Sequence, residues 1–147
     1  MRHPRVLFLC TGNSARSIIG AALLRQMAGD RFDVFSAGTH PKGINAYTAR
    51  VLAPLAIDVT GERSKSVAEF DGQTFDYVIT VCDQAAEECP VFPGAPVRIH
   101  WNFADPAAVT GSDAERLAAF QRTLREMRTR LSTFVIAAGR NGPGDCH

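Results

Sequence analysis

The chain has 147 residues, of which 46% are hydrophobic and 21% charged, and its formal net charge is +1. This length and composition predict one globular domain with a core of its own. No basic stripe is present that could neutralise a run of phosphates, which argues against general binding of nucleic acids. No apolar run approaches the roughly 20 residues of a membrane helix, and the run from Val6 to Leu9 is too short for a signal peptide. We therefore expect a cytoplasmic protein that binds neither a nucleic acid nor a membrane.

Apolar runs separated by glycine and proline predict alternating strands and helices. The strands are expected at residues 5–11, 32–36, 76–81 and 97–101. The helices are expected at residues 17–28 and about 46–53, with single helical turns at 66–70 and 83–88. This alternation is typical of an α/β protein whose parallel sheet is covered by helices on both faces. In such sheets, ligands bind at the carboxyl ends of the strands.

The last helix has the clearest signal. Ser112 and Glu115 form a capping box, in which the two side chains bind free backbone amides of the first turn. Apolar residues then recur at alternating steps of three and four, which makes one continuous face. They are Leu117, Phe120, Leu124, Met127, Leu131 and Phe134. We expect this helix to pack on the sheet and to complete a single domain of residues 1–138, followed by a disordered, glycine-rich tail at 139–147.

The four cysteines stand at positions 10, 82, 89 and 146. Without an export signal, and in a chain large enough to fold without staples, they are expected to be reduced thiols rather than a disulfide framework. A zinc site does not fit, because six residues separate Cys82 from Cys89 and no second pair completes a tetrahedral set. Cys146 is interpreted as a free thiol without a catalytic part. The other three cysteines either take part in catalysis or pack in the core.

The loop between the first strand and the first helix is the strongest candidate for a functional site. It runs Cys10-Thr11-Gly12-Asn13-Ser14-Ala15-Arg16-Ser17. At such a position, successive backbone amides and the helix dipole form a cradle for an anion, and the same field stabilises a thiolate at Cys10. Gly12 is expected to allow a tight turn and Asn13 to adopt a left-handed conformation.

Two side chains complete this cradle. Arg16 can grip a tetrahedral oxyanion with two parallel hydrogen bonds, and Ser17 can donate a hydrogen bond to the sulfur of Cys10. The loop is not a nucleotide-binding P-loop, since it lacks the lysine and the opening glycine of that pattern. The simpler alternative is a buried structural cysteine at a strand end. The placement of Cys10 and Arg16 around Gly-Asn-Ser, between an apolar strand and a helix, favours the functional interpretation.

This stretch resembles the low-molecular-weight protein tyrosine phosphatases and the arsenate reductases built on that fold. Both carry a cysteine, five residues and an arginine followed by serine or threonine, at this distance from the amino terminus. The resemblance extends from about Val6 to Phe134 and implies a three-layer fold, with a four-stranded parallel sheet between helices. It also implies Cys10 as the nucleophile, Arg16 as the oxyanion binder, and Asn13 and Ser17 as supports of the loop.

Asp105-Pro106 follows the fourth expected strand, where both groups of this fold place a general acid. A carboxyl group near the bound oxyanion can protonate a leaving oxygen. The alternative is an ordinary Asp-Pro turn. Phosphatases of this fold usually follow the Asp-Pro pair with aromatic residues, whereas Ala107 and Ala108 follow here. A small pocket wall favours an inorganic anion over phosphotyrosine.

The segment around Cys82 and Cys89 distinguishes the branches of this fold. A phosphatase needs one thiol, whereas three thiols suit a relay that passes electrons by disulfide exchange. The segment looks like that of the arsenate reductases coupled to thioredoxin. The resemblance implies that Cys10 attacks arsenate, that Cys82 then attacks Cys10, and that Cys89 finally attacks Cys82. Phosphate and sulfate are expected as competing anions.

Other functions remain open at this point. A low-molecular-weight phosphatase would hydrolyse phosphomonoesters through a Cys10 phosphoenzyme. A redox-regulated anion-binding protein would show no useful turnover. The reductant is also open, because a glutathione–glutaredoxin route could resolve the same Cys10–Cys82 disulfide that thioredoxin would resolve through Cys89.

Some reductases of this group bind potassium beside the loop through Asn13, a serine and two carboxylates. Ser36 is present, but the carboxylate positions fall on Ala21 and Lys65. We therefore expect no bound metal or other cofactor and no dependence on potassium. The ammonium group of Lys65 is expected to take the place of the cation and to steady the loop through Asn13.

Overall fold

Four parallel strands form one sheet in the order β2-β1-β3-β4 in the computed structural model, which describes residues 3–141, with side chains up to Ala138. The strands are β1 (Arg5–Cys10), β2 (Asp33–Gly38), β3 (Tyr77–Thr80) and β4 (Val97–His100). All four were predicted, and their ends lie within two residues of the expected ones. The expected four-stranded parallel α/β sheet is confirmed.

The helices are also close to their predicted positions. They are α1 (Arg16–Ala28), α2 (Ala46–Leu52), α3 (Asp83–Glu87) and α4 (Asp113–Asn141), with single 3-10 turns η1 (Ala53–Leu55), η2 (Val67–Phe70) and η3 (Pro106–Ala108). Helix α4 continues three residues into the segment that was assigned to the tail. The first of these three residues is Gly139. A glycine costs about 1 kcal/mol in a helix, and this is too little to end a helix as long as α4. The rest of the expected tail, with Cys146, lies outside the described residues.

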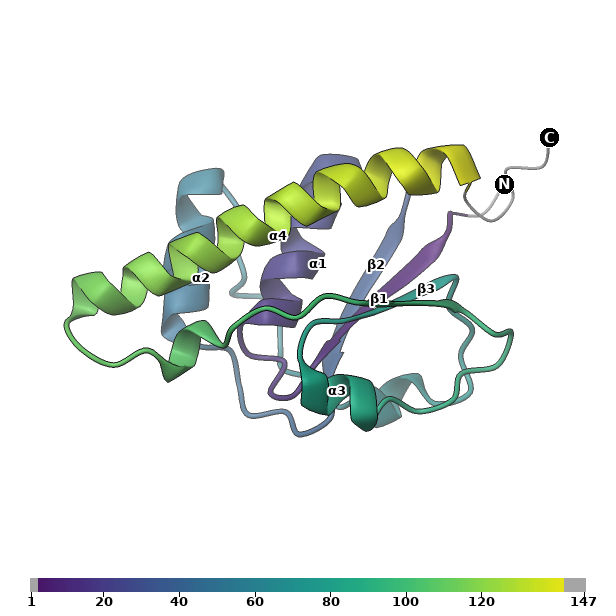
Figure 1. Ribbon diagram of the computed structural model, residues 1–147, viewed down its shortest axis with the longest axis horizontal. Helices are drawn as coiled ribbons and strands as arrows, with labels where there is room; N and C mark the ends of the chain where they lie inside the picture. The colour runs from purple at the N-terminus through teal and green to yellow at the C-terminus, as the bar shows by residue number, and fades with distance from the viewer. Residues whose placement is uncertain (1–2, 142–147) are drawn as a thin grey trace.

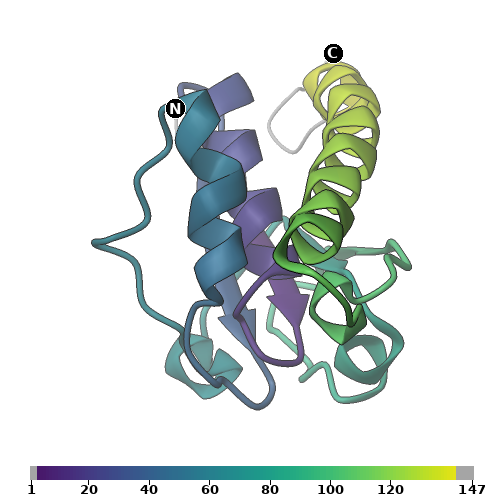
Figure 2. The same cartoon turned by 90° about the vertical axis from the view of Figure 1, so that its left-hand side faces the viewer.

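Helices α1, α2 and α4 lie on one side of the sheet (Figures 1 and 2), where α1 packs on β1 and β2. Helix α2 packs on α4, and Tyr47 stacks on Phe120 with ring centroids 5.4 Å apart. The opposite face is covered by η2 and by a cluster of aromatic side chains from β2, from η2 and from two loops. These rings belong to Phe35, Phe70, Phe75 and Phe92. The second outer layer therefore consists of short elements rather than long helices.

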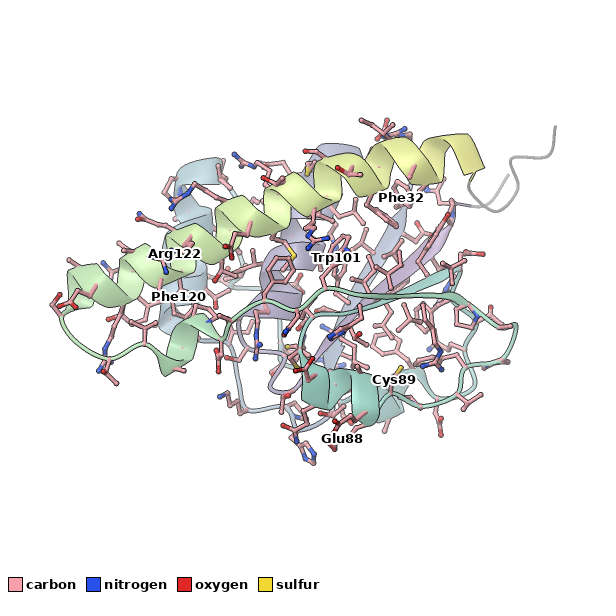
Figure 3. All side chains as sticks on the ribbon, in the orientation of Figure 1. Phe32, Glu88, Cys89, Trp101, Phe120 and Arg122 are labelled. Atoms are coloured by element: carbon pink, nitrogen blue, oxygen red, sulfur yellow. The ribbon has the colours of Figure 1, made fainter. Side chains whose placement is uncertain are left out.

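The core under α4 is centred on Phe134, near the end of its apolar face. Its ring centroid lies 5.7 Å from Phe32, 5.1 Å from Tyr77 and 6.3 Å from Trp101, two of which are labelled in Figure 3. The capping box is formed as predicted, since Glu115 N donates to Ser112 Oγ and Ser112 N donates to Glu115 Oε1. No helix within residues 3–141 has both the length and the apolar character needed to cross a membrane.

The strand register brings the chemistry of distant segments to one edge of the sheet. Cys10 is the last residue of the central strand β1, and it pairs with Gly38 of β2. On the other side, Leu9 pairs with Thr80, and Thr80 pairs with His100. Cys82, two residues beyond Thr80, therefore leaves the sheet at the same edge as Cys10.

Candidate active site at the carboxyl edge of the sheet

The loop from Cys10 to Arg16 curls around the sulfur of Cys10. Asn13 has φ of 43°, which confirms the predicted left-handed conformation. This conformation turns the Asn13 amide inward, and it donates to Cys10 Sγ at 3.2 Å. Cys10 is buried, with 3% of its surface exposed. The loop thus holds the sulfur in place and limits access to it.

A chain of three hydrogen bonds connects the backbone of Lys65 to the sulfur of Cys10 through Asn13 and Ser17. Lys65 N donates to Asn13 Oδ1 at 2.8 Å, so the amide nitrogen of Asn13 must face the other way. That nitrogen donates to Ser17 Oγ at 2.7 Å. The hydroxyl proton of Ser17 is then free to point at Cys10 Sγ, 2.8 Å away. The predicted contact between Ser17 and the sulfur is confirmed.

The predicted role of the Lys65 ammonium group is wrong. Lys65 supports Asn13 through its backbone amide, which any residue except proline could supply. Its ammonium group instead donates to the carbonyl of Arg63 at 3.2 Å. Burial lowers the pKa of this half-buried amine, because the charged form loses solvation there.

Besides the tight turn that the sequence predicted, the structure gives a packing reason for a glycine at position 12. The positive φ of the loop lies at Asn13, not at Gly12. A Cβ atom on Gly12 would lie 2.8 Å from Cε of Lys42, so the glycine makes room for a side chain from another loop.

Two hydroxyl groups that the sequence did not single out also hold the cradle. Ser64 Oγ lies 2.9 Å from the carbonyl oxygens of Gly12 and Asn13, and Thr48 Oγ1 donates to that of Ser14 at 2.8 Å.

Arg16 and Asp105 meet at the mouth of the cradle, as the sequence predicted. Arg16 Nη1 donates to the carbonyl of Phe103 at 2.9 Å, and its Nη2 lies 3.9 Å from Asp105 Oδ2. Asp105 also caps η3, since its Oδ1 accepts from the amide of Ala107 at 3.0 Å. The functional interpretation and the turn interpretation of Asp105 are therefore compatible: one carboxylate oxygen caps the turn and the other faces the arginine.

These groups line a small cavity of about 200 Å³. Its lining comprises Cys10, Thr11, Gly12, Ser14, Ala15, Arg16, Lys42, Gln84, Asp105 and Ala107. Pockets for drug-sized molecules span about 300–1,000 Å³, so this one suits a tetrahedral anion better than a large organic group. Asn13 and Ser17, which the sequence placed in the loop, act from behind the lining. Lys42 and Gln84 are additions, and they come from the loop after β2 and from the first turn of α3.

Cys82 is connected to the cradle through Thr11. Cys82 is buried and precedes α3 as its N-terminal capping residue. Its sulfur lies 3.2 Å from Thr11 Oγ1, which is also 3.4 Å from Gln84 Oε1. Thr11 is the residue after Cys10, so this contact links the second thiol to the loop around the first.

Cys89 lies just beyond the other end of α3, and Figure 3 labels it there beside Glu88. It is half-buried, and its thiol donates to the carbonyl of Pro90 at 3.5 Å. Burial raises the pKa of the Cys89 thiol, and the nearby guanidinium of Arg98 opposes this rise. Cys10, Cys82 and Cys89 are all free thiols.

Two histidines tether α3, the helix between these thiols. His100 Nε2 lies 3.0 Å from Asp83 Oδ1, while its Nδ1 lies 2.8 Å from Thr80 Oγ1. His40 Nε2 lies 2.9 Å from Glu88 Oε1 at the opposite end of the helix. Among the described residues, no group of three or more histidine, cysteine or acidic side chains is arranged to hold a metal ion.

Comparison with known proteins places this geometry in a family. Residues 5–142 match the family model of the low-molecular-weight phosphotyrosine protein phosphatases. An arsenate reductase of Halalkalibacterium halodurans is 37% identical over 135 residues, which cover 92% of this chain and 97% of that protein. Two solved structures are also similar. The arsenate reductase of Archaeoglobus fulgidus has a TM-score of 0.72 at 28% identity, and the match covers 88% of this chain and 98% of that one. A thioredoxin-dependent arsenate reductase of Corynebacterium glutamicum has a TM-score of 0.61 at 26% identity, covering 89% of this chain and 63% of that one.

Proposed function

The chain belongs to the low-molecular-weight phosphotyrosine protein phosphatase family and, within it, to the arsenate reductases, and on this premise we propose that Cys10, Cys82 and Cys89 reduce arsenate to arsenite as a relay of three thiols. The observation that carries the proposal is the 3.2 Å contact between Thr11 Oγ1 and Cys82 Sγ. It joins the second thiol to the loop that binds the first.

The first step forms a bond between sulfur and arsenic. Arsenate enters the cavity and is held by the amides of the loop and by Arg16. The thiolate of Cys10, stabilised by Ser17 and by the amide of Asn13, attacks the arsenic. Asp105 protonates the departing oxygen, which leaves as water. The position of Asp105 beside Arg16 supports this role.

The second step reduces the arsenic. The thiolate of Cys82 attacks Sγ of Cys10, which forms a disulfide and breaks the bond between sulfur and arsenic. The electron pair of that bond remains on the arsenic, so arsenate becomes arsenite and is released. Thr11 is suited to orient Cys82 for this attack, because its hydroxyl contacts the Cys82 sulfur.

The third step moves the disulfide away from the cavity. Cys89 attacks Cys82, which releases Cys10 as a thiolate and leaves a Cys82–Cys89 disulfide for an external dithiol to reduce. A disulfide requires its two Cα atoms to lie within about 7 Å. Cys82 must therefore approach first Cys10 and then Cys89, so the segment with α3 has to move or unfold between the two exchanges.

Thioredoxin is the electron donor in this proposal, and the similarity to the thioredoxin-dependent arsenate reductase of Corynebacterium glutamicum supports that choice. Glutathione with glutaredoxin is the other thiol route. Phosphate and sulfate are the competing anions, because they share the tetrahedral shape of arsenate. The proposal also implies a reducing compartment such as the cytoplasm, because three free thiols are needed.

The test is oxidation of NADPH by thioredoxin reductase and thioredoxin when arsenate is added to the protein. Sustained oxidation is expected with the unchanged chain and should be lost in Cys10→Ser, Cys82→Ser and Cys89→Ser. Oxidation that survives Cys82→Ser or Cys89→Ser would reject the relay. Oxidation only with glutathione and glutaredoxin would keep Cys10 and Cys82 and reject thioredoxin.

Hydrolysis of phosphomonoesters is the second candidate function, because the cradle and Asp105 would serve it equally well. The small wall at Ala107 gives an aromatic leaving group little to pack against. Release of phosphate from an aryl ester, without any thiol reductant and faster than arsenate is reduced, would favour this candidate. A protein that binds anions but turns over neither substrate would instead be a redox-regulated binding protein.

A further inference from the structure

Lys42 belongs to a segment that is bound to the cradle along its backbone. After β2, three amides donate to successive carbonyls of the cradle: Thr39 N to Cys10 O at 3.1 Å, His40 N to Thr11 O at 2.8 Å, and Lys42 N to Gly12 O at 3.0 Å. Because both partners of each bond are backbone atoms, the position of Lys42 relative to the cradle is set by the fold rather than by its own flexible side chain.

The side chain of Lys42 lies across the loop. A Cβ built on Gly12 would lie 2.8 Å from Cε, 3.0 Å from Cγ and 3.2 Å from Cδ of Lys42. The stem therefore occupies the space that a side chain at position 12 would need. Lys42 is also one of the residues that line the cavity.

The cavity is lined by two cationic side chains, Arg16 and Lys42, which differ in whether they have a partner. Arg16 donates to the carbonyl of Phe103 and faces the carboxylate of Asp105. Within the described part of the chain, the ammonium group of Lys42 has neither a hydrogen bond nor an ion pair. A free positive charge beside an anion pocket makes the free energy of anion binding more favourable, and this gain is proportional to the charge of the anion.

We propose that Lys42 is a specificity-determining residue of this site, and that its ammonium group makes the cavity select doubly charged over singly charged tetrahedral oxyanions. The inference rests on the proposed function, and it names the ionic form of the substrate that this site takes. Arsenate at neutral pH is a mixture of singly and doubly charged ions. Lys42 would draw the doubly charged form into the cradle.

The test compares two tetrahedral anions of fixed charge, sulfate with two negative charges and perchlorate with one. Each anion protects Cys10 from alkylation by iodoacetamide, which is followed by mass spectrometry of the Cys10 peptide at constant ionic strength. Lys42→Met keeps a long stem over Gly12 and removes the charge. It should weaken the binding of sulfate about tenfold, as for one charge-assisted hydrogen bond. Perchlorate has half the charge, so its binding should weaken only about threefold.

Two further variants complete the design. Lys42→Arg should restore sulfate binding to within about twofold, since a guanidinium also binds oxyanions. Arg122→Met removes one charge from an exposed residue of α4 that does not line the cavity (Figure 3), and should change either affinity by less than about twofold, because solvent screens exposed charges. In the arsenate assay, Lys42→Met should raise KM rather than lower kcat.

Two results would overturn the inference. One is a Lys42→Met protein that binds sulfate within about twofold of the unchanged chain. The other is an equal loss for sulfate and perchlorate, which would indicate a steric effect rather than an effect of charge. Protection of Cys10 does not depend on turnover. A chain that selects sulfate through Lys42 but does not reduce arsenate would therefore reject the proposed function alone, and a chain that reduces arsenate but is protected by neither anion would reject this inference alone.

Discussion

The hydroxyl oxygen of Ser17 lies 2.8 Å from the sulfur of Cys10 and is held there by Asn13. Asn13 donates to that oxygen from behind, and the backbone of Lys65 prevents the Asn13 amide from turning round. The contact of Ser17 with the nucleophile is therefore held in place by residues that do not line the cavity. Such preorganised donors stabilise charge without rearranging during the reaction.

Replacing Ser17 by alanine should slow the attack of Cys10. The thiolate would lose a charge-assisted hydrogen bond, which corresponds to a decrease of roughly tenfold in reactivity. The measurement is the rate at which iodoacetamide alkylates Cys10 at neutral pH. Ser132→Ala removes an exposed hydroxyl from α4 and is the matched control. Equal rates in Ser17→Ala and the unchanged chain would show that this contact does not activate the sulfur.

Replacing Cys89 by serine should limit the protein to a single turnover. The second exchange would have no attacking thiol, so the chain would stop as the Cys10–Cys82 disulfide. Rapid-quench assays should find about one arsenite per chain, and mass spectrometry should find that disulfide. Cys146→Ser removes the thiol that was predicted to have no catalytic part, and it should keep multiple turnovers. Steady turnover of Cys89→Ser with thioredoxin would contradict the relay.

The transfer from Cys82 to Cys89 should speed up as the pH rises. Burial raises the pKa of the Cys89 thiol, so the attacking thiolate is scarce at neutral pH. Its fraction should grow about tenfold per unit between about pH 6 and pH 8. The same raised pKa also affects stability, because the folded state binds the Cys89 proton more tightly than the unfolded state does. It therefore adds to the free energy of unfolding while the thiol is protonated. This contribution is lost as the pH rises from the ordinary pKa of a thiol through the raised pKa of the folded state.

Replacing Arg98 by methionine provides the check on this pH dependence. The guanidinium lowers the pKa of Cys89, so its removal should slow the transfer further at any fixed pH. The rate is obtained by acid quench and mapping of the disulfides. Arg128→Met on α4 is the control for net charge. A transfer rate that does not vary with pH would mean that movement of the segment, not ionisation of Cys89, limits this step.

Replacing His40 by alanine should loosen the end of α3 that carries Glu88. The hydrogen bond from His40 lowers the pKa of Glu88, so the variant should raise that pKa toward its ordinary value. The contribution of this pair to stability is present at neutral pH and is lost as the pH falls through the depressed pKa. A carboxyl titration by NMR measures the shift. Glu69, which Arg63 holds at a lowered pKa, is the internal control and should not change.

Replacing Phe134 by alanine should destabilise the whole domain. Its ring contacts Phe32, Tyr77 and Trp101, and a large cavity would remain between α4 and the sheet. The expected loss in the free energy of unfolding is about 3–5 kcal/mol, measured by urea denaturation. Ile136, two residues further along the helix, is 58% exposed. Ile136→Ala should change the free energy by less than about 0.5 kcal/mol, and a similar loss in both variants would show that Phe134 does not anchor the core.

The parts of the site that the sequence predicted well are those formed by neighbouring residues. The left-handed Asn13 and the contact of Ser17 with Cys10 depend on a strand, a turn and a helix that follow one another. The position of Asp105 beside Arg16 was also predicted, because the family resemblance places an acidic residue just after the fourth strand. In each case the motif itself contains the geometry.

What the sequence could not predict are the contributions of residues from distant parts of the chain. Lys42 and Gln84 line the cavity because of how β2 and β3 pair with β1, and this register is not written in any local pattern. Lys65 misled the prediction for a related reason. A substitution by lysine suggests a new charge at the old position, but the backbone amide makes the contact and the side chain turns elsewhere.

Helix α3 has only five residues, and its ends are held by exposed pairs between histidines and carboxylates. So short a helix has little stability of its own in water. Exposed ion pairs add at most about 1 kcal/mol each. If the segment has to open in every catalytic cycle, then a more stable α3 raises the melting temperature of the protein but lowers its turnover rate. A substitution that lengthens or caps α3 would give a protein that melts later and works more slowly.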